Sequence, residues 1–175
     1  MINSPNLTNA NTTGIFANEI TVLGIGNIIL SDEGFGVRVA EYLQEKYNFP
    51  DNVALIDGGT LGIELTQFIT GTKKLLIIDS INGGKPPGTL FHLEGDEIRA
   101  HFNEKLSAHE VGIQDVLTML ELTGKNISEV VVIGAQPFTL EAGVELSPQM
   151  KLLLPQIADK AIEILKRWKV SISAC

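Results

Sequence analysis

Cysteine is almost absent from this sequence of 175 residues, because its only one, Cys175, is the last residue. Without a second cysteine the chain forms no internal disulfide and no cysteine-rich metal site. No apolar run approaches the roughly 20 residues that a membrane-spanning helix needs. Positive charge is also scarce, since 13 Lys and Arg stand against 21 Asp and Glu, for a net charge of -8. This balance argues against sequence-independent binding of nucleic acid, which requires a basic surface.

Residues 1–18 contain neither the basic segment nor the apolar core of a secretory signal. Together with the lack of cysteine, this predicts a cytoplasmic protein. The segment is rich in Asn and Thr and has no apolar periodicity, so we expect a flexible N-terminal tail. The length fits one domain, which we place at residues 19–170, followed by a C-terminal tail at 171–175.

Several sequence signatures of catalysis are missing as well. The chain has no Gly-x-Ser-x-Gly elbow, no phosphate-binding Walker loop and no HExxH motif, so covalent catalysis has little support. The Gly24-Ile25-Gly26 turn suggests a dinucleotide site with Asp57 as the ribose acid. The third small residue of that fingerprint is replaced by Ile29, which counts against nucleotide binding.

Alternating apolar and amphipathic segments predict the fold class. Segments with the composition of strands are 20–23, 53–56, 74–80, 89–93 and 130–133. Helices are expected at 32–47, at 61–68, after Ser107-Ala108-His109, and after Ser147-Pro148, where Pro155 should divide the helix. The short connection after Ser80 favours an antiparallel fourth strand. We predict an α/β fold: a three-layer α/β/α sandwich, phosphorylase/hydrolase-like, with a mixed, mostly parallel sheet of about five strands.

Three side chains with metal-binding or proton-transferring chemistry are expected at one edge of this sheet. The stretch 21–36, TVLGIGNIILSDEGFG, places Asp32 and Glu33 after the first strand. Asp79 closes the apolar third strand, and His109 begins a helix. Two carboxylates and an imidazole suit a borderline divalent metal in an open site. Each also has a simpler interpretation: Glu33 as a first-turn helix carboxylate, Asp79 as a turn cap, and His109 as a helix-start residue.

Beyond these residues, the chain resembles the maturation endopeptidases of nickel-iron hydrogenases. The matching motifs are GIGNIILSDEGFGVRVAEYL from Gly24, DGGTLGIEL from Asp57, LLIIDSINGGKPPGTL from Leu75, SAHEVGIQDVL from Ser107 and VVVIGAQP from Val130. The resemblance covers about residues 20–166. It implies an enzyme that removes a C-terminal peptide from the hydrogenase large-subunit precursor after nickel has entered it. The implied partners are that precursor and possible nickel-insertion accessory proteins, with no organic cofactor.

The resemblance also implies roles for particular residues. Its metal-contacting positions fall on Glu33, Asp79 and His109, and the metal is the nickel that the precursor carries. Either Asp79 or Glu33 would activate the attacking water, as a metal-assisted or aspartic-type peptidase. Asp57, Gly58, Gly59, Thr60 and Asp32 are the expected substrate-binding residues of the neighbouring loops. Glu110 departs from the family, in which many members have Gln.

Two other functions remain open from the sequence. The first is a non-enzymatic, nickel-dependent checkpoint protein that binds the precursor without cutting it. The second is a hydrolase of another substrate, or a nucleotide-binding protein, on the same fold.

Overall fold

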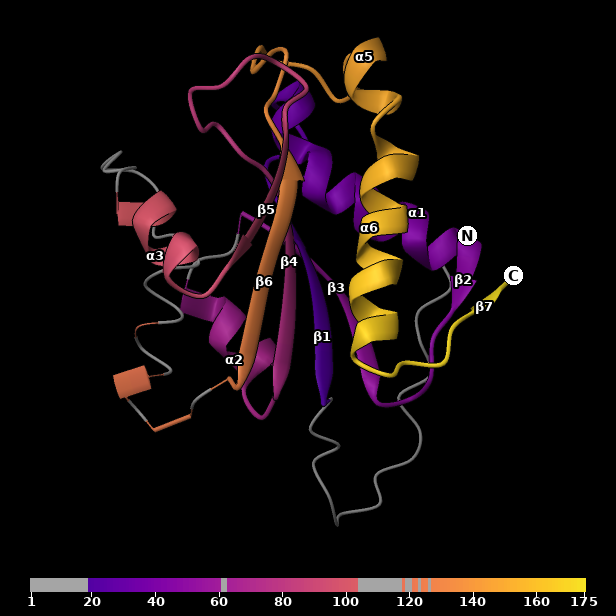
Figure 1. Cartoon of the computed structure of the whole chain (residues 1–175). Helices are drawn as coiled ribbons and strands as arrows, with labels where there is room; N and C mark the ends of the chain where they lie inside the picture. Colours follow the sequence, from indigo (N-terminus) through magenta and orange to yellow (C-terminus); the bar gives the residue numbers. More distant parts are fainter. Residues whose placement is uncertain (1–18, 61–62, 104–117, 119–120, 123, 126) are drawn as a thin grey trace.

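The computed structural model describes residues 19–60, 63–103, 118, 121, 122, 124, 125 and 127–175. Its centre is a five-stranded sheet in the order β3-β1-β4-β6-β5 (Figure 1). The strands are β1 (Ile20–Ile25), β3 (Val53–Gly59), β4 (Lys74–Ser80), β5 (Leu90–Glu94) and β6 (Glu129–Ala135). The pairs β1–β3, β1–β4 and β4–β6 are parallel, and β5 pairs antiparallel with β6. The predicted mixed, mostly parallel sheet is therefore confirmed, including its antiparallel strand.

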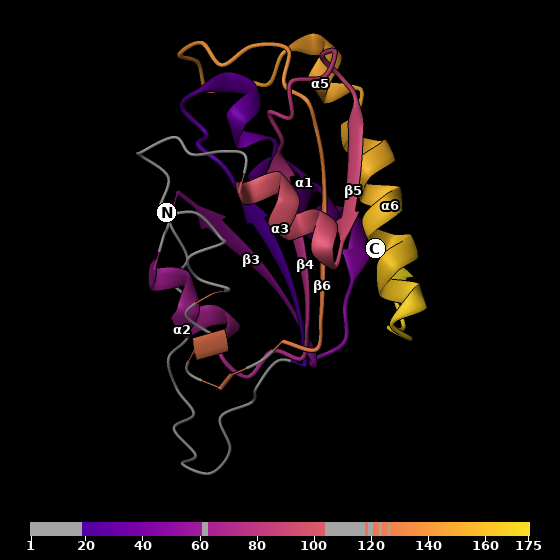
Figure 2. The same ribbon diagram turned by 60° about the vertical axis from the view of Figure 1, so that its left-hand side comes forward.

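Helices cover both faces of the sheet, as Figures 1 and 2 show. One face carries α1 (Phe35–Lys46) and α6 (Leu154–Arg167), and the other carries α2 (Thr66–Ile69) and α3 (Asp96–Asn103). Successive side chains along a strand point to opposite faces of the sheet, so each strand contributes to two cores. Leu76 and Ile78 of β4 pack in the core under α1 and α6, whereas Leu75 and Ile77 pack in the core under α2 and α3. The three-layer α/β/α prediction is confirmed.

Proline and serine define the helices near the end of the chain. Ser147 caps α5 (Pro148–Lys151) by accepting a hydrogen bond from the Met150 N–H at 3.2 Å. Pro148 takes the first helical position, where no N–H is needed. Pro155 lies at the start of α6, so the predicted division of this region is found. Near the chain's beginning, the predicted helix from Asp32 has a 3-10 first turn, η1 (Ser31–Gly34), before α1 starts.

Some short elements were not predicted from the sequence. The 3-10 turn η2 (Ile63–Leu65) and most of α2 fall within the helix predicted at 61–68, but α3 and the antiparallel pair β2 (Tyr47–Asn48) and β7 (Ser173–Ala174) correspond to no predicted element. The last pair includes part of the segment that we set apart as a C-terminal tail. Two-residue strands are too short to show periodicity, which explains the omission. Most of the helix expected after His109 lies outside the described residues, although residues 118, 121 and 122 are helical. No helix in the described part of the chain is long and apolar enough to cross a membrane.

Candidate active site

The backbone at the beginning of α1 packs directly against the backbone at the carboxyl ends of β1 and β4. A Cβ atom added to Gly36 would lie 2.0 Å from the Ile78 carbonyl oxygen, and one added to Gly24 would lie 2.4 Å from the Gly36 carbonyl oxygen. Gly26, with a φ of 138°, passes equally close to the carbonyl of Glu33. Only glycine allows these approaches. The glycine turn thus places η1 directly on the sheet edge.

Glu33 and Asp79, the two predicted catalytic carboxylates, lie on neighbouring elements of this edge. Glu33 belongs to η1, and η1 contacts β4, in which Asp79 is the residue before the last. Both residues are half-buried, and each interacts with another group of the protein. By strand alternation Asp79 shares the face of Leu75 and Ile77, which is the face under α2 and α3. A half-buried carboxylate at this position is suited to accept a proton from water.

The third predicted metal-contacting residue, His109, lies outside the described residues, as does Glu110. Among the residues that are described, no group of three His, Cys, Asp or Glu side chains could hold a metal ion. The assignment of Glu33, Asp79 and His109 as a nickel-contacting set therefore stays a prediction.

Residues 57–60, predicted as a loop, are mostly the end of β3, and they lie beside the glycine turn. Asp57 pairs in register with Gly24, and its Oδ1 accepts a hydrogen bond from the Gly59 N–H at 2.9 Å. The Gly59 carbonyl in turn accepts one from the Gly26 N–H at 2.9 Å. This N–H belongs to the turn that a dinucleotide phosphate would approach, so the contact counts against nucleotide binding. Asp57 and Thr60 are exposed, and their role in substrate binding stays a prediction.

Asp32 is fully buried, with 0% of its surface exposed, although it is adjacent to the half-buried Glu33. Its Oδ2 accepts hydrogen bonds from the N–H groups of Phe138 at 3.0 Å and Thr139 at 3.1 Å, and from the Ser147 hydroxyl at 2.9 Å. Its Oδ1 accepts one from the Ser147 N–H at 2.7 Å. Asp32 therefore holds the segment between β6 and α5 against η1 through these hydrogen bonds. Because its carboxylate is buried, Asp32 could affect substrate binding only through the position of this segment.

Gln136 is also a buried polar residue, and the sequence analysis did not identify it. Its Oε1 accepts hydrogen bonds from the N–H groups of Gly83 at 2.9 Å and Lys85 at 3.2 Å, and its Nε2 donates to Asn82 Oδ1 at 2.9 Å. It thereby holds the loop after β4, which follows Asp79. Its position just past the end of β6, at the same sheet edge, was the signal that could have identified it.

The comparison with protein families decides the identity of this fold. Residues 37–164 match the model of the family described as hydrogenase maturation protease. The chain belongs to this family. Membership makes it a peptidase of hydrogenase maturation.

Curated relatives of this hydrogenase maturation protease agree. The hydrogenase expression/formation protein HoxM of Cupriavidus necator is 41% identical over 151 residues, which span 85% of this chain and 75% of that protein. The hydrogenase 2 maturation protease of Escherichia coli is 37% identical over 148 residues, spanning 84% and 90% of the two chains. The same similarity therefore extends over most of both proteins.

Solved structures of the family have the same fold as this maturation protease. The hydrogenase maturating endopeptidase HybD from Escherichia coli superposes with a TM-score of 0.84 at 35% identity, covering 89% of this chain and 97% of HybD. The maturation protease HybD from Thermococcus kodakarensis gives 0.68 at 26% identity, covering 83% and 98%. The carboxyl edge that carries Glu33 and Asp79 therefore lies within a fold shared with proteases of hydrogenase maturation.

Proposed function

We propose that this protein is an endopeptidase that removes the C-terminal extension from the precursor of a nickel-iron hydrogenase large subunit, after nickel has been inserted. Membership of the maturation protease family supports the reaction type. The observation that carries the proposal further is the placement of Glu33 and Asp79 on adjoining elements at the carboxyl edge of the sheet. In an open α/β sheet this edge is where ligands bind.

The chemistry is hydrolysis of one peptide bond. Asp79 or Glu33 accepts a proton from a water molecule, whose oxygen attacks the carbonyl carbon of the scissile bond. The C–N bond then breaks, and the leaving amine takes up a proton. We propose that the nickel of the precursor is the recognition element, contacted by Glu33, Asp79 and His109. Three ligands without cysteine would hold a metal only loosely, which suits a transient contact with a metal that belongs to the substrate.

The partner and the location follow from the same proposal. The partner is the folded large-subunit precursor with its nickel in place, together with any accessory proteins still bound to it. Insertion and cleavage would take place in the cytoplasm, before the subunit joins its partner subunit.

Nickel-loaded and nickel-free precursor, each incubated with the protein, provide the test. Intact-mass spectrometry should show a shortened large subunit only with the nickel-loaded precursor. Equal cleavage of both forms would refute nickel recognition. A nickel-loaded precursor that binds the protein tightly but stays intact would instead identify a checkpoint protein without peptidase activity.

A further inference from the structure

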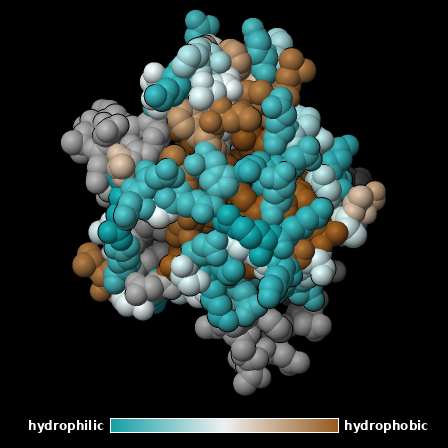
Figure 3. Space-filling model, viewed as in Figure 1, coloured by the Kyte–Doolittle hydropathy of each residue, from teal (hydrophilic) through white to brown (hydrophobic). Residues whose placement is uncertain are grey.

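Exposed apolar side chains gather on two loops at the carboxyl edge of the sheet. The loop before η1 carries Ile28 and Ile29, and the segment between β6 and α5 carries Phe138, Leu140 and Val144. Ile29 and Val144 are 59% and 60% exposed. We call these five residues the apolar platform. Figure 3 shows the hydrophobic surface of one face of the molecule as patches between hydrophilic side chains.

The two loops of the apolar platform are joined through their backbones. The Gly143 N–H donates to the Ile29 carbonyl at 3.0 Å, and the Ser31 N–H donates to the Gly143 carbonyl at 2.7 Å. The Ser31 hydroxyl donates to the Glu141 carbonyl at 2.8 Å. Residues from the two halves of the chain therefore form one continuous surface.

This surface is also held in a fixed shape from below. Asp32 binds the segment at Phe138, Thr139 and Ser147, as described above. Arg38 of α1 donates to the Val144 carbonyl at 3.1 Å. A surface that is ordered before binding loses less conformational entropy when a partner docks. Exposed apolar groups on such a surface are typical of protein-interaction sites.

The position of the apolar platform indicates its occupant. Ile28 and Ile29 lie between the glycine turn and Glu33, so the platform is continuous along the chain with the candidate active site. Two hollows among the described residues lie elsewhere: one is lined by Trp168 and Lys74 at the amino ends of the strands, and the other lies between α1 and α5–α6. Exposed apolar side chains beside the candidate active site suit contact with a protein.

We infer that the apolar platform docks the folded body of the hydrogenase precursor through an apolar surface of that protein, while the scissile segment lies over Glu33 and Asp79. The inference rests on the proposed function. It assigns affinity for the precursor to the apolar platform, and leaves the chemical step to the carboxylates.

Single-turnover cleavage of nickel-loaded precursor at increasing enzyme concentration tests this assignment. We expect the double variant Leu140→Ser/Val144→Ser to need about tenfold more enzyme for half-maximal rate, because interface truncations of this kind weaken binding. Its maximal rate should stay within about twofold of the original. Leu122→Ser is the matched control, since Leu122 is 83% exposed and lies outside the apolar platform. It should leave the concentration dependence unchanged.

Each other outcome has a definite meaning. A double variant with a normal melting temperature and an unchanged half-maximal concentration would overturn the inference. A loss confined to the maximal rate would overturn it too. Sedimentation that shows a dimer of the original protein, lost in the double variant, would make a second copy the occupant and also overturn it. If the original protein fails to cleave, the proposed function itself fails, and binding of intact precursor by both proteins then tests the docking separately.

Discussion

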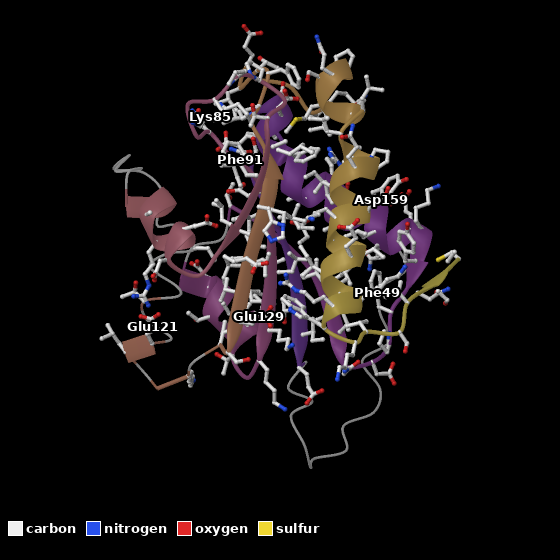
Figure 4. All side chains as sticks on the ribbon, viewed as in Figure 1. Phe49, Lys85, Phe91, Glu121, Glu129 and Asp159 are labelled. Carbon is white, nitrogen blue, oxygen red and sulfur yellow. The ribbon has the colours of Figure 1, made fainter. Side chains whose placement is uncertain are left out.

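The two ends of the parallel strands hold their neighbouring segments by different means. At the carboxyl ends, two buried side chains, Asp32 and Gln136, each bind backbone N–H groups of an irregular loop. At the amino ends, exposed ion pairs join adjacent elements. In Figure 4, Glu129 marks the amino end of β6, while Lys85 and Phe91 lie toward the carboxyl end.

Most of the contacts at the amino ends share side chains and form one connected series, and the Lys73–Glu19 pair is separate from it. The ion pairs are Lys73–Glu19 at 2.7 Å, Lys74–Glu129 at 3.4 Å, Arg167–Glu129 at 3.1 Å and Arg167–Glu94 at 2.8 Å, and Glu94 is also hydrogen-bonded to His92 at 2.6 Å. All of these side chains are between 32% and 68% exposed. Water replaces such contacts when they are removed, so each contributes little to stability.

The difference shows where the molecule depends on individual polar groups. Loss of a buried acceptor leaves several N–H groups without partners, which costs about 1–3 kcal/mol. Loss of an exposed pair leaves no such defect. The loops at the carboxyl ends, which surround Glu33 and Asp79, are therefore the more vulnerable part of the fold.

The largest effect should come from Asp79, on activity rather than stability. Asp79→Asn keeps the volume and the capping oxygen but removes the charge and the base. We expect single-turnover cleavage of nickel-loaded precursor to slow at least ~100-fold, the low end of the loss of a general base. Glu33→Gln and His109→Ala should follow the same pattern, whereas Asp57→Asn should be milder.

The matched control for Asp79 is an exposed aspartate at the other end of the strands. Asp51 lies in the turn before β3, and Asp51→Asn should change neither cleavage nor melting. Normal cleavage by Asp79→Asn, with normal melting in both variants, would remove Asp79 from the site.

The next largest effect should come from Asp32, on stability. Asp32→Asn turns one carboxylate oxygen into an amide NH₂ that faces N–H donors of Ser147 or of Phe138 and Thr139. We expect the free energy of unfolding in urea to fall by about 1–3 kcal/mol. If the urea midpoint of Asp32→Asn matched that of Asp51→Asn, the buried carboxylate at the carboxyl ends would contribute no more to stability than an exposed one at the amino ends.

The smallest effect should come from Glu94 at the amino ends. The hydrogen bond with His92, and then the one with Arg167, hold the pKa of the Glu94 carboxyl below its ordinary value of 4.5. A lowered folded-state pKa adds stability above pH 4.5 that disappears as the pH falls through the lowered value. Glu94→Gln should therefore reduce stability by less than about 1 kcal/mol at neutral pH.

The measurement for Glu94 is the melting temperature as a function of pH. Below pH 4.5, the melting temperature of the original protein should fall more steeply than the melting temperature of Glu94→Gln. Parallel curves would show that these surface pairs contribute nothing to acid stability.

The strands and their edge were predictable because their signals are local. An apolar run such as β4, closed by Asp79, identifies a buried strand and its end without knowledge of the rest of the chain. The different environments of Asp32 and Glu33 were not predictable. Both are first-turn carboxylates in the sequence, but the groups that bury Asp32 lie 106 to 115 residues further along the chain. The contacts of Gln136 with the loop after β4 are also distant in sequence, at 51 to 54 residues.

The contact of Gly36 with Ile78 links the order of folding to the appearance of activity. Helix α1 reaches its place only when its backbone can lie on the carbonyls of both β1 and β4, and these strands are separated by about fifty residues of chain. Closing such a long loop is slow, because its entropy is lost before the contact forms. Glu33 thus remains apart from Asp79 in any chain whose central strands have not yet paired. On the proposed assignment of these two carboxylates, a nascent or partly folded chain would carry no assembled site, and cutting would begin only once its own fold is complete.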